Sequence, residues 1–242
     1  MTVVNRLIFD VDGTLTPSRG KIDPEFEKFF FNICKTNYVY LVTGSDRPKT
    51  VEQVGNKLYG MAERVYNCSG CDVYKGNKNI HTSSWTLPKD ARHWLESKLE
   101  ESTFPLRTGN HIEERPGMIN YSIVGRNATL GERKLYVDYD TKNNERNTIA
   151  RAFNNYFPRL NAVVGGETGM DIFQNGFDKS QIIKDFDPVD DIIHFFGDAM
   201  HKEGNDYPLK KVIIDKDLGH CYNVKNYKET WKILKDEFDW NC

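Results

Sequence analysis

The chain has 242 residues, of which 38% are hydrophobic and 28% charged, and its formal net charge is −2. This composition is typical of a globular protein, and the charge excludes a general electrostatic attraction to nucleic acid or to a membrane surface. No apolar run approaches the roughly 20 residues that span a bilayer, and residues 1–9 lack a signal-peptide pattern, so we expect a cytoplasmic protein with no nucleic-acid or membrane partner.

The N-terminal segment combines a short apolar run with two acids. Residues 7–9 predict a buried strand, and Asp10, Asp12 and Gly13 follow it. A strand that ends in acids places them at its carboxyl edge, where open α/β sheets bind ligands. Paired carboxylates suit Mg²⁺ and phosphoryl transfer, with one Asp as nucleophile and the other as acid/base. The alternative is a turn with solvated acids, because Asp-Gly is also a turn signal.

The next elements continue a βαβ order. Asp23 is a good N-cap for a helix that begins at Pro24, and residues 38–42 predict a second buried strand. That strand ends in the sequence TGSD, in which Thr43 and Ser45 both offer a hydroxyl for a phosphate site. A turn that only caps the following helix is the alternative. We expect that helix over 48–58, a strand over 64–67 and a hairpin over 73–80.

The pattern changes near residue 81. An amphipathic helix is expected over 90–99, an alternating, half-exposed strand over 118–124 and a helix over 143–157. We interpret residues 81–175 as an inserted α/β domain lying over a core formed by residues 1–80 and 176–242.

Four arginines of the inserted domain lie near predicted strand ends: Arg107, Arg115, Arg126 and Arg133. Guanidinium groups that converge there would grip a phosphate bidentately. The alternative is that each arginine pairs with a nearby glutamate on a solvated face.

The core resumes near residue 176. Lys179 opens a predicted helix and would neutralise an acidic, phosphate-bearing site. Residues 191–196 predict another buried strand, and Asp198 follows it as a third acid at the carboxyl edge. We expect a strand over 212–215 and a final amphipathic helix over 227–238.

Five cysteines are scattered along the chain, which is not the pattern of a disulfide framework. Cys68 and Cys71 have the spacing of a zinc or redox site, but no second Cys or His pair lies at a suitable distance. We interpret them as two thiols at a strand-to-turn junction.

Residues 7–16, LIFDVDGTLT, resemble motif I of the haloacid dehalogenase (HAD) phosphotransferases. The resemblance implies that Asp10 is the nucleophile, that Asp12 is the acid/base, and that the Asp10 carboxylate and the Asp12 backbone carbonyl hold Mg²⁺. Thr43 or Ser45 matches motif II and Lys179 matches motif III. The segment GDAMHKEGND resembles motif IV, in which Asp198 completes the metal site. The implied fold is α/β, with a HAD-type Rossmann-like parallel-sheet core and an inserted α/β cap domain.

Over nearly the whole chain the sequence resembles the eukaryotic-type phosphomannomutase family. The segments that carry this resemblance are PSRGKI, HIEERPGMINYSIVGR, GERK, GMDIFQNGFDK and FFGD. It implies that the substrate is bound by Arg19, Arg115, Arg126, Arg133 and, at the sugar hydroxyls, by Asp171. Scattered salt bridges would not reproduce these positions, so the resemblance overrules the alternative interpretation of the arginines.

Three segments differ from the family pattern. Gly169 stands where the family usually has Ser. TGSD replaces GGSD, and its Thr43 resembles the sugar-phosphate phosphatases of the superfamily. Residues 199–203 also diverge.

The family resemblance implies a mutase that interconverts mannose 6-phosphate and mannose 1-phosphate through an aspartyl-phosphate, with Mg²⁺ and a hexose 1,6-bisphosphate activator. It further implies a homodimer through the cap and a role in GDP-mannose supply. Two alternatives stay open: a HAD sugar-phosphate phosphatase and a catalytically inactive HAD-fold binding protein. Mannose and glucose substrates are not distinguished.

Overall fold

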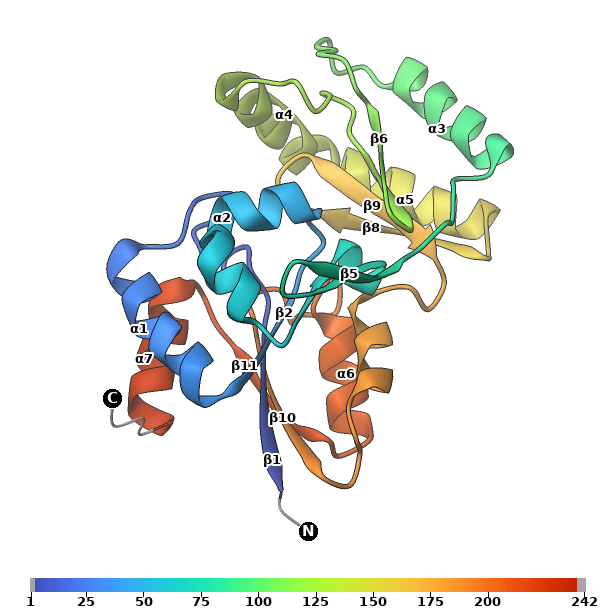
Figure 1. Ribbon diagram of the computed structural model, residues 1–242. Helices are drawn as coiled ribbons and strands as arrows, with labels where there is room; N and C mark the ends of the chain where they lie inside the picture. Colours follow the sequence, from blue (N-terminus) through green and yellow to red (C-terminus); the bar gives the residue numbers. More distant parts are fainter. Residues whose placement is uncertain (1–2, 239–242) are drawn as a thin grey trace. The chain divides into compact units, whose positions relative to one another are not determined.

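The computed structural model describes residues 3–238 and divides the chain into two compact units (Figure 1). The core unit consists of Met1–Thr82 and Phe177–Cys242, and the insert unit of Ser83–Gly176. The boundaries expected from the sequence lie within two residues of this division. Each unit has its own sheet and its own apolar cluster, as expected for two independently packed layers.

The core unit contains a seven-stranded sheet. Its order is β11 (Gly219–Asn223), β10 (Asp191–Gly197), β1 (Val4–Phe9), β2 (Tyr38–Val42), β3 (Arg64–Asn67), β4 (Asp72–Lys75) and β5 (Lys78–Thr82). The first five strands are parallel, and the β3–β4–β5 end is antiparallel. Because β1 lies between β10 and β2, the segments that follow these strands meet at one edge of the sheet.

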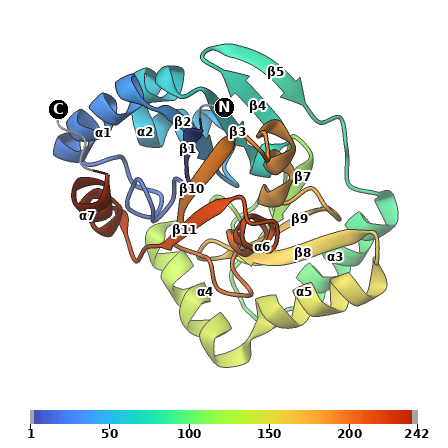
Figure 2. The ribbon, with the colours of Figure 1, turned by 90° about the horizontal axis from the view of Figure 1, so that it is seen from below.

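Helices cover both faces of this sheet (Figure 2). The α-helices are α1 (Pro24–Thr36), α2 (Arg47–Met61), α6 (Tyr207–Asp215) and α7 (Tyr227–Glu237), and the 3₁₀ helices are η1 (Cys68–Gly70) and η2 (Lys179–Asp185). Helices α1, α2 and α7 pack in the cluster that contains Leu7 and Phe9, whereas α6 and η2 pack with Ile8. Burial on both faces explains why β1 ends in an uninterrupted apolar run.

Side-chain caps begin several of these helices where the sequence predicts them. Asp23 Oδ1 accepts hydrogen bonds from the backbone N–H groups of Glu25 (2.9 Å) and Phe26 (3.1 Å). Asp46 caps α2 in the same way, through the N–H of Lys49. These bonds satisfy donors that the first turn of a helix leaves without partners.

The insert unit has a four-stranded antiparallel sheet in the order β6 (Ile112–Arg115), β7 (Met118–Tyr121), β9 (Gly169–Gln174) and β8 (Leu160–Gly165). Its helices are α3 (Lys89–Glu101), α4 (Leu130–Asn143) and α5 (Glu145–Tyr156). Side chains of all three helices pack with Ile119, Tyr121 and Ile172. Side chains alternate along a strand, so Asn120 and Asp171 project from the opposite face of this sheet.

The structure corrects two sequence predictions. Residues 212–215 are the last turn of α6, and the strand of this region is β11. Their β-branched side chains suggested a strand, but Leu209 and Ile213 lie four residues apart and bury one helical face. The strand expected over 118–124 ends at Tyr121, and all four residues of β7 are buried rather than half-exposed.

Other expected elements shift or divide. The helix expected over 143–157 is α5, which begins after Asn144, a residue in the left-handed conformation that ends α4. Helix α4 itself lacked a sequence prediction. Lys179 begins a 3₁₀ helix.

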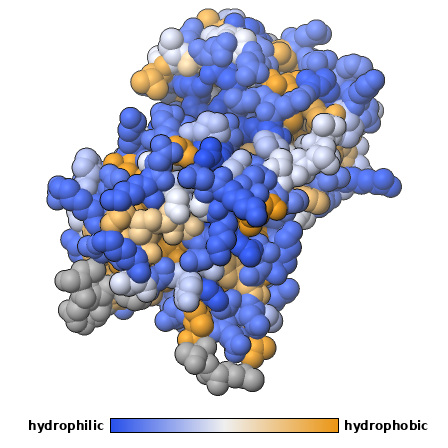
Figure 3. Space-filling model, in the orientation of Figure 1, coloured by the Kyte–Doolittle hydropathy of each residue, from blue (hydrophilic) through white to orange (hydrophobic). Residues whose placement is uncertain are grey.

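Within residues 3–238, none of the helices combines the length and apolar character that crossing a membrane requires. The face drawn in Figure 3 is mainly hydrophilic, with apolar residues in small groups.

Candidate active site

Three acids meet at the carboxyl edge of the core sheet. Asp10 directly follows β1, Asp198 directly follows β10, and Asp206 precedes α6. Each offers a carboxylate oxygen, and these three oxygens lie within 4.8 Å of one another. The parallel pairing of β1 with β10 therefore brings together residues that are far apart in the sequence.

Lys179 lies against two of these acids. Its Nζ donates to Asp10 Oδ1 at 2.5 Å and to Asp206 Oδ1 at 2.7 Å, and its side chain is fully buried. Burial alone would lower the pKa of Lys179, but the charges and hydrogen bonds of the two carboxylates outweigh it and raise the pKa. Lys179 is therefore a cation at the pH of the cell.

One lysine does not balance three carboxylates. Burial raises the pKa of Asp10 well above its usual range, Lys179 opposes this effect, and the charges of Asp206 and Asp198 add to it. Asp198 is exposed as a residue, yet partial burial of its carboxyl group and the nearby Asp206 also raise its pKa. A site made of crowded oxygen donors fits a hard divalent cation such as Mg²⁺.

Two glycines make room for these acids. A Cβ on Gly13 would lie 2.5 Å from Asp198 Oδ2, and a Cβ on Gly197 would lie 2.6 Å from Asp206 Oδ2. Gly13 also has a φ of +80°, a conformation that other residues adopt rarely. The glycine that follows Asp12 in the sequence is thus required for both its turn and its closeness to Asp198.

Asp12 has a separate environment. Its Oδ1 accepts from the backbone N–H of Arg19 at 2.7 Å and from Gln53 Nε2 at 2.8 Å, and its Oδ2 accepts from Ser45 Oγ at 3.4 Å. Gln53 is buried. Its amide therefore fixes the direction of a carboxylate that lies outside the three-acid cluster.

The two candidate hydroxyls after β2 have different contacts. Ser45 Oγ points to Asp12, whereas Thr43 Oγ1 accepts the backbone N–H of Ser45 at 3.1 Å. Thr43 is also almost fully buried. Both lie on the loop that follows the strand beside Asp10, so the choice between them stays a prediction.

In the insert unit, two of the expected arginines meet at one glutamate. Arg115 and Arg126 both form ion pairs with Glu113, and the Arg126 Nε–Glu113 Oε2 distance is 3.1 Å. Burial alone would raise the pKa of Glu113, but the two guanidinium groups outweigh it and lower the pKa. The alternative prediction, that these arginines pair with a nearby glutamate, is therefore met for Arg115 and Arg126. The same pairing places two guanidinium groups beside one anion.

The other two arginines of this group contact backbone carbonyls. Arg133, on α4, donates to the carbonyls of Ala128 and Arg126 and, at 3.0 Å, to Thr168 Oγ1. Arg107 donates to carbonyls at the end of α3, including Leu99 at 2.9 Å. Both therefore hold loops in place, and phosphate binding by Arg133 stays a prediction.

Asp171 and Gly169 both lie on β9 of the insert unit. Asp171 Oδ1 accepts from Asn120 Nδ2 at 2.7 Å, and Gly169 lies against the Asn120 side chain. Arg19 belongs to the core unit, where its φ of +56° places its backbone N–H toward Asp12.

The sequence interpretation gave no role to Asp206, Gln53, Glu113 or Asn120. Asp206 had a usable signal, since it is an acid eight residues after Asp198 within the same motif-like segment. Gln53 and Asn120 had none, because a polar residue on a helix or strand is usually solvated.

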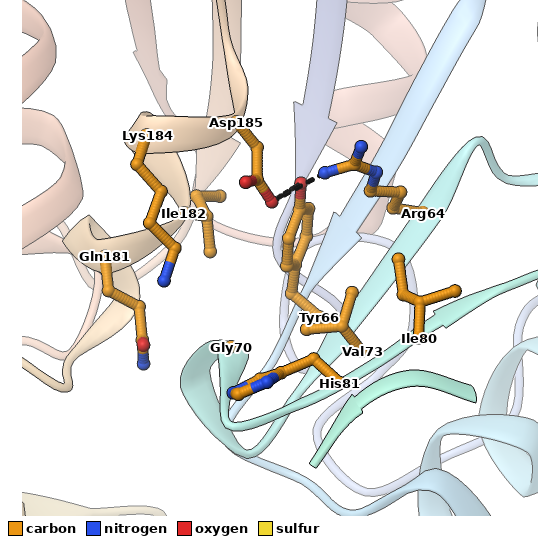
Figure 4. A pocket seen from close by; sticks show the side chains of 10 residues that line it. All are labelled: Arg64, Tyr66, Gly70, Val73, Ile80, His81, Gln181, Ile182, Lys184 and Asp185. Atoms are coloured by element: carbon orange, nitrogen blue, oxygen red, sulfur yellow. Dashed lines mark hydrogen bonds and ion pairs between the residues drawn. The ribbon is translucent and has the colours of Figure 1, made fainter. Parts of the chain in front are cut away.

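A cavity of about 280 Å³ opens in the core unit between η2 and β3–β5 (Figure 4). The Arg64–Asp185 ion pair and the Tyr66 hydroxyl lie at one end of it, and none of the three clustered acids lines it. It is therefore separate from the candidate active site. Gly70 lines it too, and the side chains of its sequence neighbours Cys68 and Cys71 are buried. Burial raises the pKa of the Cys71 thiol.

Comparisons with known proteins agree with this geometry. The family model "Eukaryotic phosphomannomutase" matches residues 26–240. A phosphomannomutase of Triticum aestivum is 32% identical over 227 residues, which cover 90% of each chain. One of Saccharomyces cerevisiae is 32% identical over 248 residues, covering 96% of this chain and 94% of the relative.

Solved structures show the same fold at low sequence identity. The truncated, IMP-bound IMP-nucleotidase of Plasmodium falciparum has a TM-score of 0.65 at 15% identity, covering 96% of this chain and 68% of that chain. The C-terminal domain of a C. albicans trehalose-6-phosphate phosphatase has a TM-score of 0.63 at 14% identity, covering 93% of this chain and 81% of that chain. These likenesses confirm the expected HAD-type α/β fold. The sequence relationship also identifies the family. The chain belongs to the eukaryotic phosphomannomutase family.

Proposed function

We propose that this protein interconverts mannose 6-phosphate and mannose 1-phosphate. The observation that carries the proposal is the buried contact of Lys179 with Asp10 and Asp206, next to Asp198, in a chain of this family. A catalytically inactive scaffold would gain nothing from this cluster, because burying two acids and a lysine together, with a third acid beside them, is costly for stability.

The chemistry we assign to the core unit is transfer through an aspartyl-phosphate. An Asp10 oxygen attacks the phosphorus at C1 of a hexose 1,6-bisphosphate, and the bond from phosphorus to the sugar oxygen breaks. Asp12 gives its proton to that leaving oxygen, and mannose 6-phosphate is released. In the second half, the C6 hydroxyl of mannose 1-phosphate attacks the phosphorus held by Asp10, the bond from phosphorus to the Asp10 oxygen breaks, and Asp12 takes up the hydroxyl proton. The bisphosphate is thereby restored.

The residues around these two acids have supporting roles in this proposal. Gln53 and the Arg19 N–H hold the Asp12 carboxylate in one direction. Lys179 compensates negative charge next to Asp10, and Ser45 or Thr43 donates a hydrogen bond to a phosphoryl oxygen.

The carboxylates of Asp10 and Asp198, with the backbone carbonyl of Asp12, are the groups we assign to Mg²⁺. The crowding of oxygen donors around Asp10 supports this assignment. A bound divalent cation would lower the repulsion between an incoming phosphoryl group and these acids.

We assign substrate binding to the insert unit and to Arg19. Arg115 and Arg126 would bind the phosphate that does not react, because both already hold an anionic side chain. Arg133 is proposed as a further phosphate contact, and Asp171 as the acceptor for sugar hydroxyls. The residue at 169, a glycine here, lies beside this acceptor.

The decisive experiment is ³¹P NMR of mannose 1-phosphate with the protein, Mg²⁺ and a catalytic amount of hexose 1,6-bisphosphate. Growth of a mannose 6-phosphate signal without inorganic phosphate supports the mutase. Inorganic phosphate as the main product contradicts it and points to a phosphatase. Repeating the assay with glucose 1-phosphate tests sugar preference.

We further propose that the protein works in the cytoplasm as a homodimer formed through the insert unit and contributes to GDP-mannose supply. The family relationship supports this assembly and role. The molar mass of the protein, measured by light scattering after size-exclusion chromatography, tests the dimer. A monomer at assay concentration would contradict it.

A further inference from the structure

We propose that Asn120 is a positioning residue that holds Asp171 ready for the hydroxyl groups of a sugar phosphate. The proposal rests on the function proposed above and adds to it a residue that determines substrate affinity. Asn120 and Asp171 are directly opposed in the register of β7 and β9. The Asn120 Nδ2 donates to Asp171 Oδ1 at 2.7 Å, and within residues 3–238 this is the one hydrogen bond to the Asp171 side chain.

Two glycines shape the space around this pair. A Cβ on Gly169 would lie 2.8 Å from both Nδ2 and Oδ1 of Asn120, and a Cβ on Gly165 would lie 2.7 Å from Asp171 Oδ2. Gly165 and Gly169 are themselves opposed in the register of β8 and β9. Neither has a positive φ, so the restriction at these two positions comes from space and not from backbone conformation. A larger residue at 169 would require the Asn120 amide to shift.

Among the residues that the structure describes, the side chain of Asn120 is buried in an orientation that leaves one of its polar atoms without a hydrogen bond, which is unusual for a structural residue. It is 5% exposed, and in the described part of the chain its Oδ1 accepts no hydrogen bond although it is buried. A buried acceptor without a donor is costly. The amide therefore keeps an orientation that serves Asp171 at the expense of its own oxygen.

The chemistry of the pair suits a polyhydroxylated ligand. The amide uses one carboxylate oxygen of Asp171 and leaves Oδ2, which has no protein donor among residues 3–238, to accept from a sugar hydroxyl. Because the amide is neutral, it fixes the carboxylate without cancelling its charge. Charged groups on the far side of Asn120 are Glu113, opposed to Asn120 in the register of β6 and β7, and the two arginines paired with Glu113.

The test compares Asn120→Ala with Asn161→Ala. Asn161 is a matched control, since it lies on the same face of the sheet and its side chain has no hydrogen bond in the described part of the chain. With mannose 1-phosphate, we expect Asn120→Ala to raise KM by about 10-fold and to change kcat by less than about twofold, the pattern of lost uniform binding. Gly169→Ala should also raise KM. The KM and kcat of Asn161→Ala should match those of the wild type.

A pH profile separates positioning from a general structural effect. Asn120→Asp puts a carboxyl group 2.7 Å from Asp171 Oδ1, and two carboxyl groups at that distance share a proton at raised pKa. Protonated, the introduced group donates as the amide does. The ratio of the KM of Asn120→Asp to the KM of the wild type should therefore fall toward one as the pH is lowered from about 7.5 to about 5.5. A ratio that does not change with pH overturns the proposal.

Calorimetric binding of mannose 1-phosphate keeps the two proposals apart. Equal affinity of the wild type and Asn120→Ala overturns the role of Asn120, whatever the catalytic activity. Tight binding without interconversion by the wild type overturns the mutase alone, and the absence of binding overturns both.

Discussion

Asp10 and Lys179 are separated by 169 residues in the sequence and joined by a hydrogen bond of 2.5 Å in the fold. The same Nζ contacts Asp206, so a single buried ammonium group holds two acids that come from different segments. This lysine is therefore a structural link as well as a proposed catalytic group.

Lys179→Ala should destabilise the core unit. The change leaves two buried carboxylates without their cation, and breaking a buried pair typically costs about 3–5 kcal/mol. Urea unfolding in the presence of a chelator measures the change in the free energy of unfolding. Lys184→Ala, an exposed residue of the same 3₁₀ helix, is the control and should change it by less than about 0.5 kcal/mol. An equal effect of both changes would contradict the argument.

Mg²⁺ should stabilise the wild type against heat and do so much less in Asp198→Asn. Binding to the folded state alone adds about 2.7 kcal/mol at a cation concentration of 100 Kd. Thermal unfolding with increasing MgCl₂ measures this shift. Asp236→Asn, an exposed acid on α7, should keep the full response. An unaltered response of Asp198→Asn would remove Asp198 from the metal site.

Gln53→Ala should lower kcat by about tenfold while KM changes little. The lost amide bond to Asp12 is a hydrogen bond to a charged group, which is worth about 1.5–3 kcal/mol, and it orients the proposed acid/base. Steady-state kinetics of the mutase reaction tests this. Glu52→Gln changes the exposed neighbour on the same helix and should leave kcat unaffected. A rise in KM alone would assign Gln53 to substrate binding instead.

Arg126→Ala should raise KM for mannose 1-phosphate by at least about tenfold, since one of two guanidinium groups that grip the phosphate is lost. Initial rates over a range of substrate concentrations give the value. The control is Arg151→Ala, which removes an exposed guanidinium group from α5 of the same unit. If mutase activity were lost while hydrolysis continued, the phosphatase would become the better assignment.

His194 should make stability fall as the pH falls from about 6.5 toward 4. Burial and the charge of the neighbouring His220 lower the pKa of His194 to about 4, whereas the unfolded chain keeps the ordinary value of about 6.5. The unfolded state therefore binds the proton first, and folding loses free energy across this window. The ring also contacts Asn5 and Tyr222. Urea unfolding of His194→Gln at several pH values should show a flatter dependence than the wild type, and an equal slope would contradict it.

The sequence was sufficient for β1, β2 and β10 because these strands are largely buried and contain apolar runs. It also put Asp10 and Asp198 at the ends of two such strands, and the fold brings Lys179 into contact with Asp10. The strand expected over 212–215 was wrong for a related reason: three β-branched residues followed by an acid are too few to reveal the spacing of Leu209 and Ile213 on one helical face.

The remaining site residues depend on pairing that a single sequence does not contain. Asn120 becomes a partner of Asp171 only through the register of β7 and β9. Gln53 reaches Asp12 from the interior of α2, where a glutamine usually contacts solvent. Glu113 lies close in sequence to Arg115 but joins Arg126 only through the fold.

The place of the insert unit in the chain has a consequence for synthesis on the ribosome. Strand β1 is made before the insert unit, but its partner β10 begins at Asp191, after the whole of Ser83–Gly176. The insert unit is continuous and completes its own contacts first, while β1 keeps one edge unpaired for most of translation. An exposed apolar edge invites pairing with other chains. The nascent protein is thus most prone to aggregation before β10 is made, and the three-acid site forms only after Asp198 and Asp206 have been added.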